Sequence, residues 1–146
     1  MQTELQKQGD GKLCPMAIII RDGQILRGLW NYTKDKWKDI SVWTIPGGRS
    51  DVGETIEQAL RREVYEEIGV DDLKIIDIIG YAPGVKDDDR IVFYHCETEQ
   101  EPRLMEPEKF SEWNWTPVAD YLNETEDFNP KGKEVISIYL KRVYGL

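Results

Sequence analysis

Short blocks of apolar residues alternate with polar segments along most of the chain. Two strand-length blocks, residues 14–21 and 24–32, flank Asp22-Gly23, a dipeptide typical of a tight hairpin turn. A Lys- and Asp-bearing segment at residues 33–40 is a predicted loop. Further short apolar blocks predict strands at residues 41–45, 73–81, 90–98 and 112–116. The pattern therefore predicts a sheet that begins with a β-hairpin.

Helical periodicity appears in two longer segments. In residues 54–68 the apolar positions recur every four residues and predict a helix that packs on the sheet: Ile56, Leu60, Val64 and Ile68. Residues 132–144 predict a C-terminal helix with Val135, Ile138 and Tyr139 on its buried side, after a helical turn at residues 118–122. The polar residues 1–12 predict a frayed start or a short edge segment. The expected fold class is α/β, a mixed β-sheet sandwiched between helices.

Three carboxylates share one face of the first predicted helix. Glu63, Glu66 and Glu67 lie at positions i, i+3 and i+4, where like charges repel one another. Mg²⁺ takes a few carboxylates together with water and substrate phosphates, so a bound cation would relieve this repulsion. The alternative interpretation is an ordinary solvated face of a Glu-rich helix.

The residues around these carboxylates carry a resemblance to a known family. Gly48, Glu54, Arg62-Glu63, Glu66-Glu67 and Gly69 have the spacing of the box of the Nudix hydrolases, over residues 48–70. The lead-in at residues 43–49 is similar to that family as well, and residues 128–142 resemble its MutT-type members. The resemblance implies one Nudix hydrolase domain over residues 1–146, with an α/β/α sandwich fold.

The resemblance also implies a reaction. It is the Mg²⁺-dependent cleavage of a (deoxy)nucleoside triphosphate to monophosphate and pyrophosphate by water attack on phosphorus, with Mn²⁺ as a possible substitute. One alternative is a hydrolase of a nucleoside diphosphate linked to another moiety, such as a nucleotide sugar or ADP-ribose. The other is a non-catalytic nucleotide sensor with the same fold, in which loss of box carboxylates or an added DNA-binding domain is expected. Since all box acids are present, hydrolysis is favoured.

Carried over residue by residue, the resemblance implies a catalytic and metal-binding set. The general base is Glu63 or a neighbouring box Glu, and Arg62 is placed to orient these carboxylates through paired hydrogen bonds. The implied metal ligands are the Gly47 carbonyl, Glu63, Glu66, Glu67 and Glu108, with Glu106 as the next candidate for the last position. Glu54 is expected to favour the helix start rather than to bind metal.

Substrate contacts follow from the same resemblance. Arg49 is the expected phosphate contact, with a surface salt bridge as the alternative. The expected base-binding residues are Phe128, Asn129 and Trp115. Two departures from the MutT type argue against a role in removing oxidised nucleotides. Gly132 stands where that type has an Asn, and Leu29-Trp30 stand where it has arginines.

Composition narrows the remaining choices. A chain of 146 residues suits one domain, and its net charge of −9 argues against a nucleic-acid scaffold, which needs a basic patch. The chain shows no apolar run of membrane-spanning length and no secretion signal, so we expect a cytoplasmic monomer or homodimer that acts on a small nucleotide. Cys14 and Cys96 are expected to be free thiols rather than a disulfide, and His95 a structural histidine. Zinc has no plausible ligand set, and Asp87-Asp88-Asp89 is expected to be a solvated hairpin tip.

Overall fold

The computed structural model describes residues 1–31, 43–84, 86, 88–124 and 129–146. Its strands are β1 (Leu13–Arg21), β2 (Gln24–Trp30), β3 (Trp43–Thr44), β4 (Lys74–Pro83), β5 (Arg90–Glu97) and β6 (Phe110–Pro117). Its helices are α1 (Gln2–Leu5), α2 (Ile56–Ile68), α3 (Val118–Asn123) and α4 (Pro130–Tyr144). Each predicted strand and helix is present among these elements, with shifts at its ends.

The strands form one mixed sheet in which β3, β2, β1, β5 and β4 are paired in that order. Strand β6 lies off this path and pairs with β2. Strands β1 and β5 are parallel, and the remaining pairs are antiparallel. The described pairs between β1 and β2 lie at the hairpin, where Ile20 faces Ile25. Nearer its start, β1 is joined instead to the segment before α2, through the bond from Ala17 N to Pro46 O at 2.8 Å. The segment that leads into α2 therefore takes the place of β2 beside the first half of β1.

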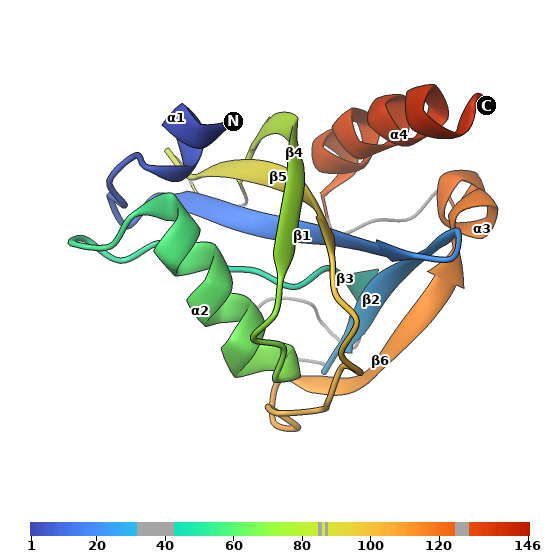
Figure 1. Ribbon diagram of the computed structural model, residues 1–146, viewed down its shortest axis with the longest axis horizontal. Helices are drawn as coiled ribbons and strands as arrows, with labels where there is room; N and C mark the ends of the chain where they lie inside the picture. The colour runs from blue at the N-terminus through green and yellow to red at the C-terminus, as the bar shows by residue number, and fades with distance from the viewer. Residues whose placement is uncertain (32–42, 85, 87, 125–128) are drawn as a thin grey trace.

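Two apolar cores lie on opposite faces of this sheet, with α2 on one face and α4 on the other (Figure 1). The first core contains the predicted α2 stripe, and all four of its side chains have no exposed surface: Ile56, Leu60, Val64 and Ile68. The second core joins α4 and Tyr121 of α3 to Phe93 of β5. The predicted mixed sheet between helices is confirmed.

The start of the chain is more ordered than the frayed segment predicted as one alternative. Leu5 of α1 is 2% exposed and belongs to the first core. The following residues are joined to the start of α2, with Ile56 N donating to Lys7 O at 2.9 Å. Gln8 forms an isolated β-bridge with Thr55, which is closer to the edge-segment alternative. One buried leucine in a polar stretch is the signal that this segment packs on α2.

The predicted buried side of α4 was wrong at one position. Tyr139 is buried and Val135 packs against the second core, but Ile138 is 64% exposed. The helix buries Ile136 and Leu140, and a residue two positions from Ile136 is turned about 200° away from it. Ile138 therefore faces outward.

Two further expectations concern the cysteines and membrane spans. Cys14 is partly exposed and Cys96 is buried, and both are free thiols, as predicted. Within the described part of the chain, no helix has the length and apolar character needed to cross a membrane.

Candidate active site

Helix α2 is fixed at both ends by the residues that flank it. Thr55 caps its start by accepting a hydrogen bond from Gln58 N, and the Gln58 side chain accepts from Thr55 N, which forms a capping box. Gly69 ends the helix with a φ of 72°, a left-handed conformation that favours glycine. Because the apolar stripe is buried at the same time, the rotation of the acidic face of α2 is determined.

Glu67 is the most buried of the three box acids. It is 6% exposed, and its Oε1 accepts a hydrogen bond of 2.8 Å from Gly47 N. Burial raises the pKa of the Glu67 carboxyl well above its usual range, and the negative charges of Glu63 and Glu106 add to that effect. This carboxylate therefore lies in a poorly hydrated place with other acids nearby.

The glycine pair before α2 allows the acidic face to approach the backbone closely. Gly47 has a φ of 143°, and a Cβ there would lie 2.4 Å from Pro15 O. A Cβ on Gly48 would lie 2.6 Å from the carboxyl carbon of Glu63. Gly47 requires glycine because a Cβ there would meet backbone atoms, whereas at Gly48 the Glu63 carboxyl would have to move; this segment therefore lies directly against Glu63 and Glu67.

Arg62 binds the acids on either side of it along α2. Its guanidinium donates to Glu54 at 2.7 and 3.1 Å, to Glu63 at 3.0 Å and to Glu66 at 3.2 Å. The ion pair with Arg62 lowers the pKa of Glu54, whereas burial raises the pKa of Glu63 although Arg62 opposes that shift. Arg62 therefore holds two box carboxylates in place, and Glu54 serves as its anchor.

A further acid approaches Glu67 from the segment before β6. That acid is Glu106, whose charge contributes to the raised pKa of Glu67 and whose Oε1 is buried without a hydrogen-bond partner. Lys109 lies 3.4 Å from the other Glu106 oxygen. Glu108, the residue first chosen from the sequence for this position, is exposed. The structure thus brings Glu106 rather than Glu108 to the box acids.

These acids are the donor set that a divalent cation would meet. Among the described residues, no group of three or more His, Cys, Asp or Glu side chains has an arrangement that could hold a metal ion. Arg62 donates hydrogen bonds to Glu63 and Glu66, and the Gly47 amide donates to one oxygen of Glu67, so these oxygens already have partners. The chemistry still fits a hard cation, since Glu63, Glu67 and Glu106 are oxygen donors with little hydration and one buried oxygen lacks a partner.

A cavity of about 620 Å³ opens beside Glu67. Its lining combines one box acid, Glu67, with the glycine pair, apolar residues and two aromatic side chains: Cys14, Met16, Trp30, Thr44, Ile45, Gly47, Gly48, Arg49, Glu67, Gly84, Lys86, Asp89, Ile91 and Phe110. This size suits a small-molecule ligand such as a nucleotide. The sequence did not point to Trp30, Lys86, Asp89 or Phe110 as members of one site, because they come from three separate segments: the end of β2, the connection between β4 and β5, and the start of β6.

Arg49 lies in this cavity and is paired with Asp89. Two hydrogen bonds of 2.7 Å join its guanidinium to the Asp89 carboxylate, and a third of 2.8 Å reaches Gly11 O. The Arg49 guanidinium holds the pKa of Asp89 below its usual value. Asp89 is therefore more than a solvated hairpin tip, because it fixes the position of Arg49. Asp87, from the same run, lies outside the described residues.

A smaller cavity of about 50 Å³ adjoins the first and is lined by a buried arginine, Arg27. Arg27 is 6% exposed and binds Glu124 through two hydrogen bonds, of 2.6 and 3.0 Å. Its guanidinium lies 4.9 Å from the ring centre of Trp43 and 5.9 Å from that of Tyr121. A single Arg within a predicted strand gave no sign of this arrangement, which depends on residues nearly a hundred positions away.

Asn129 and Trp115, two of the three base-binding residues that the sequence predicts, do not line the cavity that contains Glu67. Asn129 caps α4 by accepting from Gly132 N at 2.9 Å, and its amide nitrogen donates to Pro83 O at 2.9 Å. Trp115 does not line the cavity that contains Glu67; its ring lies 4.7 Å from the Arg21 guanidinium. Phe128 lies outside the described residues.

Gly132 has a packing role that explains its departure from the MutT type. A Cβ on Gly132 would lie 2.8 Å from Cζ of Phe93, so glycine allows α4 to approach β5. We expect Gly132→Asn to lower stability by about 1–3 kcal/mol through overpacking. Thermal unfolding should show this loss, whereas the exposed control Lys131→Asn should change the midpoint little. Equal midpoints for the two variants would contradict the close contact.

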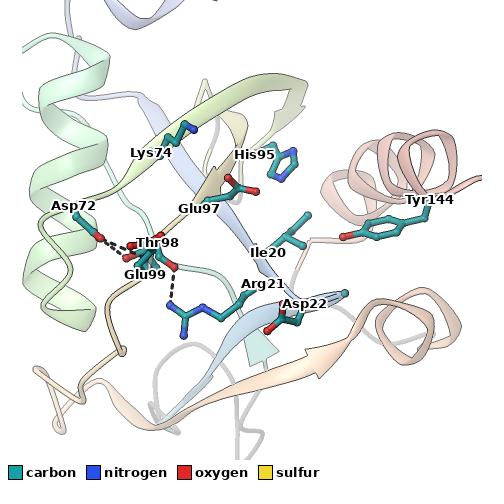
Figure 2. Close-up of a pocket in the computed structure, with 11 residues that line it drawn as sticks. Ile20, Arg21, Asp22, Asp72, Lys74, His95, Glu97, Thr98, Glu99 and Tyr144 are labelled. Carbon is teal, nitrogen blue, oxygen red and sulfur yellow. Dashed lines mark hydrogen bonds between the residues drawn. The ribbon is translucent and has the colours of Figure 1, made fainter.

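A third cavity, of about 740 Å³, lies at the other end of β1 (Figure 2). Several of its polar groups are paired within the protein. Arg21 donates to Thr98 O at 2.6 Å, Asp72 accepts from the Thr98 hydroxyl, and His95 Nδ1 lies 2.7 Å from the Tyr139 hydroxyl. His95 is thus a structural histidine, as predicted. The cavity contains none of the box acids, so the candidate active site is the one beside Glu67.

Comparison with known proteins identifies the same segment. The NUDIX domain family model matches residues 16–137. Over 59 residues, the chain is 37% identical to the oxidized purine nucleoside triphosphate hydrolase of Danio rerio, which is 40% of this chain and 35% of that protein. It is 30% identical over 116 residues to Nudix hydrolase 5 of Arabidopsis thaliana, and this match covers 73% of this chain and 37% of that protein. With the NAD-capped RNA hydrolase NudC of Haemophilus influenzae it shares 25% identity over 130 residues, covering 88% and 48%. The chain spans less than half the length of each of these relatives.

Solved structures show the same fold at low identity. The MutT protein of Methanosarcina mazei Go1 has a TM-score of 0.70 at 17% identity, with 90% of this chain and 94% of that chain covered. The Ap4A hydrolase of C. elegans also has a TM-score of 0.70 at 17% identity, covering 91% and 99%. An ADP-ribose pyrophosphatase of Streptococcus suis has a TM-score of 0.67 at 20% identity, covering 92% of each chain. The likeness to these three proteins concerns the fold alone.

Proposed function

Because the chain belongs to the NUDIX domain family, we propose that it is a divalent-metal-dependent hydrolase that cleaves a (deoxy)nucleoside triphosphate to monophosphate and pyrophosphate. The observation that carries the proposal is the acid cluster around the buried Glu67 at the cavity. Burial raises the pKa values of Glu67 and Glu63, and the negative charges of Glu63 and Glu106 add to the shift at Glu67. Such an arrangement destabilises the protein unless positive charge arrives with the substrate.

The cation would be Mg²⁺ or Mn²⁺, held by Glu63, Glu66, Glu67 and the Gly47 carbonyl, with Glu106 in place of Glu108 as the further acid. When bound, it supplies charge that neutralises the phosphates and makes water a better nucleophile. Glu63 or a neighbouring box Glu takes the proton from the attacking water. Arg62 keeps the box carboxylates in position, since it contacts both Glu63 and Glu66.

The basic groups of the cavity suit the phosphates of the substrate. Arg49 and Lys86 line it, and Asp89 holds the Arg49 guanidinium through two hydrogen bonds. We expect Arg49 to contact a phosphate while it remains paired with Asp89, because a guanidinium has five donors. Pairing of this kind orients the donor before substrate binds.

The runner-up is hydrolysis of a nucleoside diphosphate linked to another moiety. It is favoured by one specific observation, a cavity of about 620 Å³ whose lining includes apolar and aromatic side chains as well as basic groups. Two of the similar proteins are named as an ADP-ribose pyrophosphatase and a UDP-X diphosphatase, although their likeness to this chain shows the fold alone. A non-catalytic nucleotide sensor is the remaining alternative.

A phosphate-release screen separates these possibilities. The panel contains nucleoside triphosphates, nucleotide sugars, ADP-ribose and a 5′-triphosphorylated oligoribonucleotide, each with Mg²⁺ and with chelator as the control. We expect Mg²⁺-dependent release from triphosphates only when pyrophosphatase is added. Release from the linked diphosphates only with phosphatase would establish the runner-up. Nucleotide binding without hydrolysis anywhere in the panel would establish the sensor.

A further inference from the structure

Two aromatic rings form a stacked pair at one wall of the active-site cavity. Trp30 ends β2, and Phe110 begins β6 as its partner across the strands. Their ring centres are 6.3 Å apart with an angle of 21° between the planes. Trp113 lies behind Phe110, with ring centres 4.7 Å apart. Phe110 is 2% exposed, whereas Trp30 is only half-buried. The indole therefore packs beside a buried phenyl ring that is itself in contact with Trp113.

This aromatic pair shares its cavity with the acid cluster. Trp30, Phe110 and Glu67 all line the same space of about 620 Å³. Its floor is apolar at Met16, Ile45 and Ile91, whereas Arg49 and Lys86 carry positive charge. A ligand that fills this space can meet carboxylates (Glu67 and Asp89) and basic groups, and also aromatic or apolar side chains. Nucleotides combine these two chemistries, since a charged phosphate chain is attached to a planar base.

We propose that Trp30 is the residue that binds the planar base of the substrate by stacking, and that it thereby favours nucleotides over phosphate chains that lack a base. The inference rests on the proposed function for the identity of the ligand, because the base is the planar part of a nucleotide. Trp30 does this without charge, at a place where MutT-type proteins have arginines. Phe110 is a positioning residue, which keeps the indole plane fixed behind the base.

The other aromatic side chains near the cavity are less suited to this role. Trp43 lies against the Arg27 guanidinium, in the smaller cavity of about 50 Å³. Trp115 is placed against Arg21, and its partner across the strands is Leu26, four positions before Trp30 in β2. Among the described aromatic residues, Trp30 and Phe110 line the cavity with Glu67, and Phe110 is nearly buried.

Equilibrium binding tests stacking of the base on Trp30 independently of turnover. The probes are the four ribonucleoside triphosphates and inorganic tripolyphosphate, which lacks a base, measured by calorimetry on the full chain with Ca²⁺. We expect Trp30→Ala to weaken binding of the best nucleoside triphosphate about 10- to 100-fold, the usual effect of losing one stacked base. Tripolyphosphate binding should change less than about twofold, because its contacts are charge-based.

Matched variants separate stacking from general damage. Trp30→Phe keeps an aromatic face and should retain most of the affinity, whereas Trp30→Leu keeps apolar bulk and should lose it as Trp30→Ala does. Trp115→Phe is the control at an aromatic residue that does not line this cavity, and thermal midpoints confirm that each variant is folded. The stacking role of Trp30 is refuted if Trp30→Leu binds nucleotides as tightly as the wild type does. It is also refuted if Trp30→Ala loses as much affinity for tripolyphosphate as for nucleotides.

The outcome also distinguishes this inference from the proposed function. If the wild-type protein binds nucleotides through Trp30 but does not hydrolyse them, the proposed reaction is refuted and the stacking role of Trp30 stands. If the wild-type protein hydrolyses triphosphates and Trp30→Ala has an unchanged KM, the reaction stands and the stacking role is refuted. Wild-type protein that binds tripolyphosphate as tightly as every nucleotide also refutes it.

Discussion

Glu67→Gln should lower turnover about 1,000-fold while leaving the protein folded. The change keeps the side-chain shape and an oxygen that can accept the hydrogen bond from Gly47 N. It removes the negative charge proposed to bind the divalent cation, and metal stabilisation of phosphoryl charge is worth several kcal/mol. At 1.36 kcal/mol for each factor of ten, a loss of about 4 kcal/mol corresponds to this decrease. Steady-state phosphate release with saturating Mg²⁺ measures it.

The same variant should be more stable than the wild type when chelator is present. Burial raises the pKa of Glu67, so the folded state holds a carboxyl that resists ionisation. Below the ordinary Glu pKa of about 4.3 both states are protonated and the penalty vanishes. As pH rises through the raised folded pKa, the wild type loses stability that Glu67→Gln keeps. The advantage therefore grows with pH, at about 2–4 °C of thermal midpoint for each kcal/mol.

Glu66→Gln is the matched control for stability. Its carboxyl belongs to the same helix, but the Glu66 side chain is 45% exposed and hydrated. We expect a midpoint within about 1 °C of the wild type in chelator at every pH, because exposed charge pairs contribute little. A Glu67→Gln midpoint that is lower than wild type at neutral pH would show that the Glu67 charge is compensated in the folded protein.

Sequence alone was sufficient for the part of the fold where local signals agree. In α2, the four-residue apolar spacing predicts the buried face, and the helix ends at the glycine that follows it, whereas the cap at Thr55 was not predicted. The spacing of Glu63 and Glu67 on that helix, together with Gly47-Gly48, predicts the acidic face beside which the cavity lies. These features lie within about twenty residues, so their relative positions follow from one helix and one turn.

The remaining features depend on which distant segments meet, and periodicity does not encode that. The choice between Glu106 and Glu108 depends on how the segment before β6 crosses α2. The meeting of Trp30 with Phe110 depends on the register between β2 and β6, which contains an irregularity next to Trp30. Asn129 looked free to contact a base, but as the residue before α4 its side chain caps the helix. In each case the side chain's role is set by a contact partner that the local sequence does not reveal.

Glu124→Ala should destabilise the protein by about 3 kcal/mol, more than removal of its partner. The pair is asymmetric, because the Arg27 side chain is 7% exposed and that of Glu124 is 39% exposed. Loss of Glu124 leaves a buried guanidinium with fewer acceptors, which is the costly way to break such a pair. Arg27→Met leaves a carboxylate that water can reach, so we expect a loss of only about 1–2 kcal/mol.

Chemical unfolding of the two single variants and the double variant tests this asymmetry. The double variant Arg27→Met, Glu124→Ala should be more stable than Glu124→Ala alone, because the stranded charge is gone. Glu101→Ala is the control, since Glu101 is 80% exposed where it pairs with Arg21, and its loss should cost less than about 1 kcal/mol. Equal losses from Glu124→Ala and Glu101→Ala would mean that water reaches the Arg27 guanidinium. The smaller cavity beside the active site would then be more open than its packing against Trp43 and Tyr121 indicates.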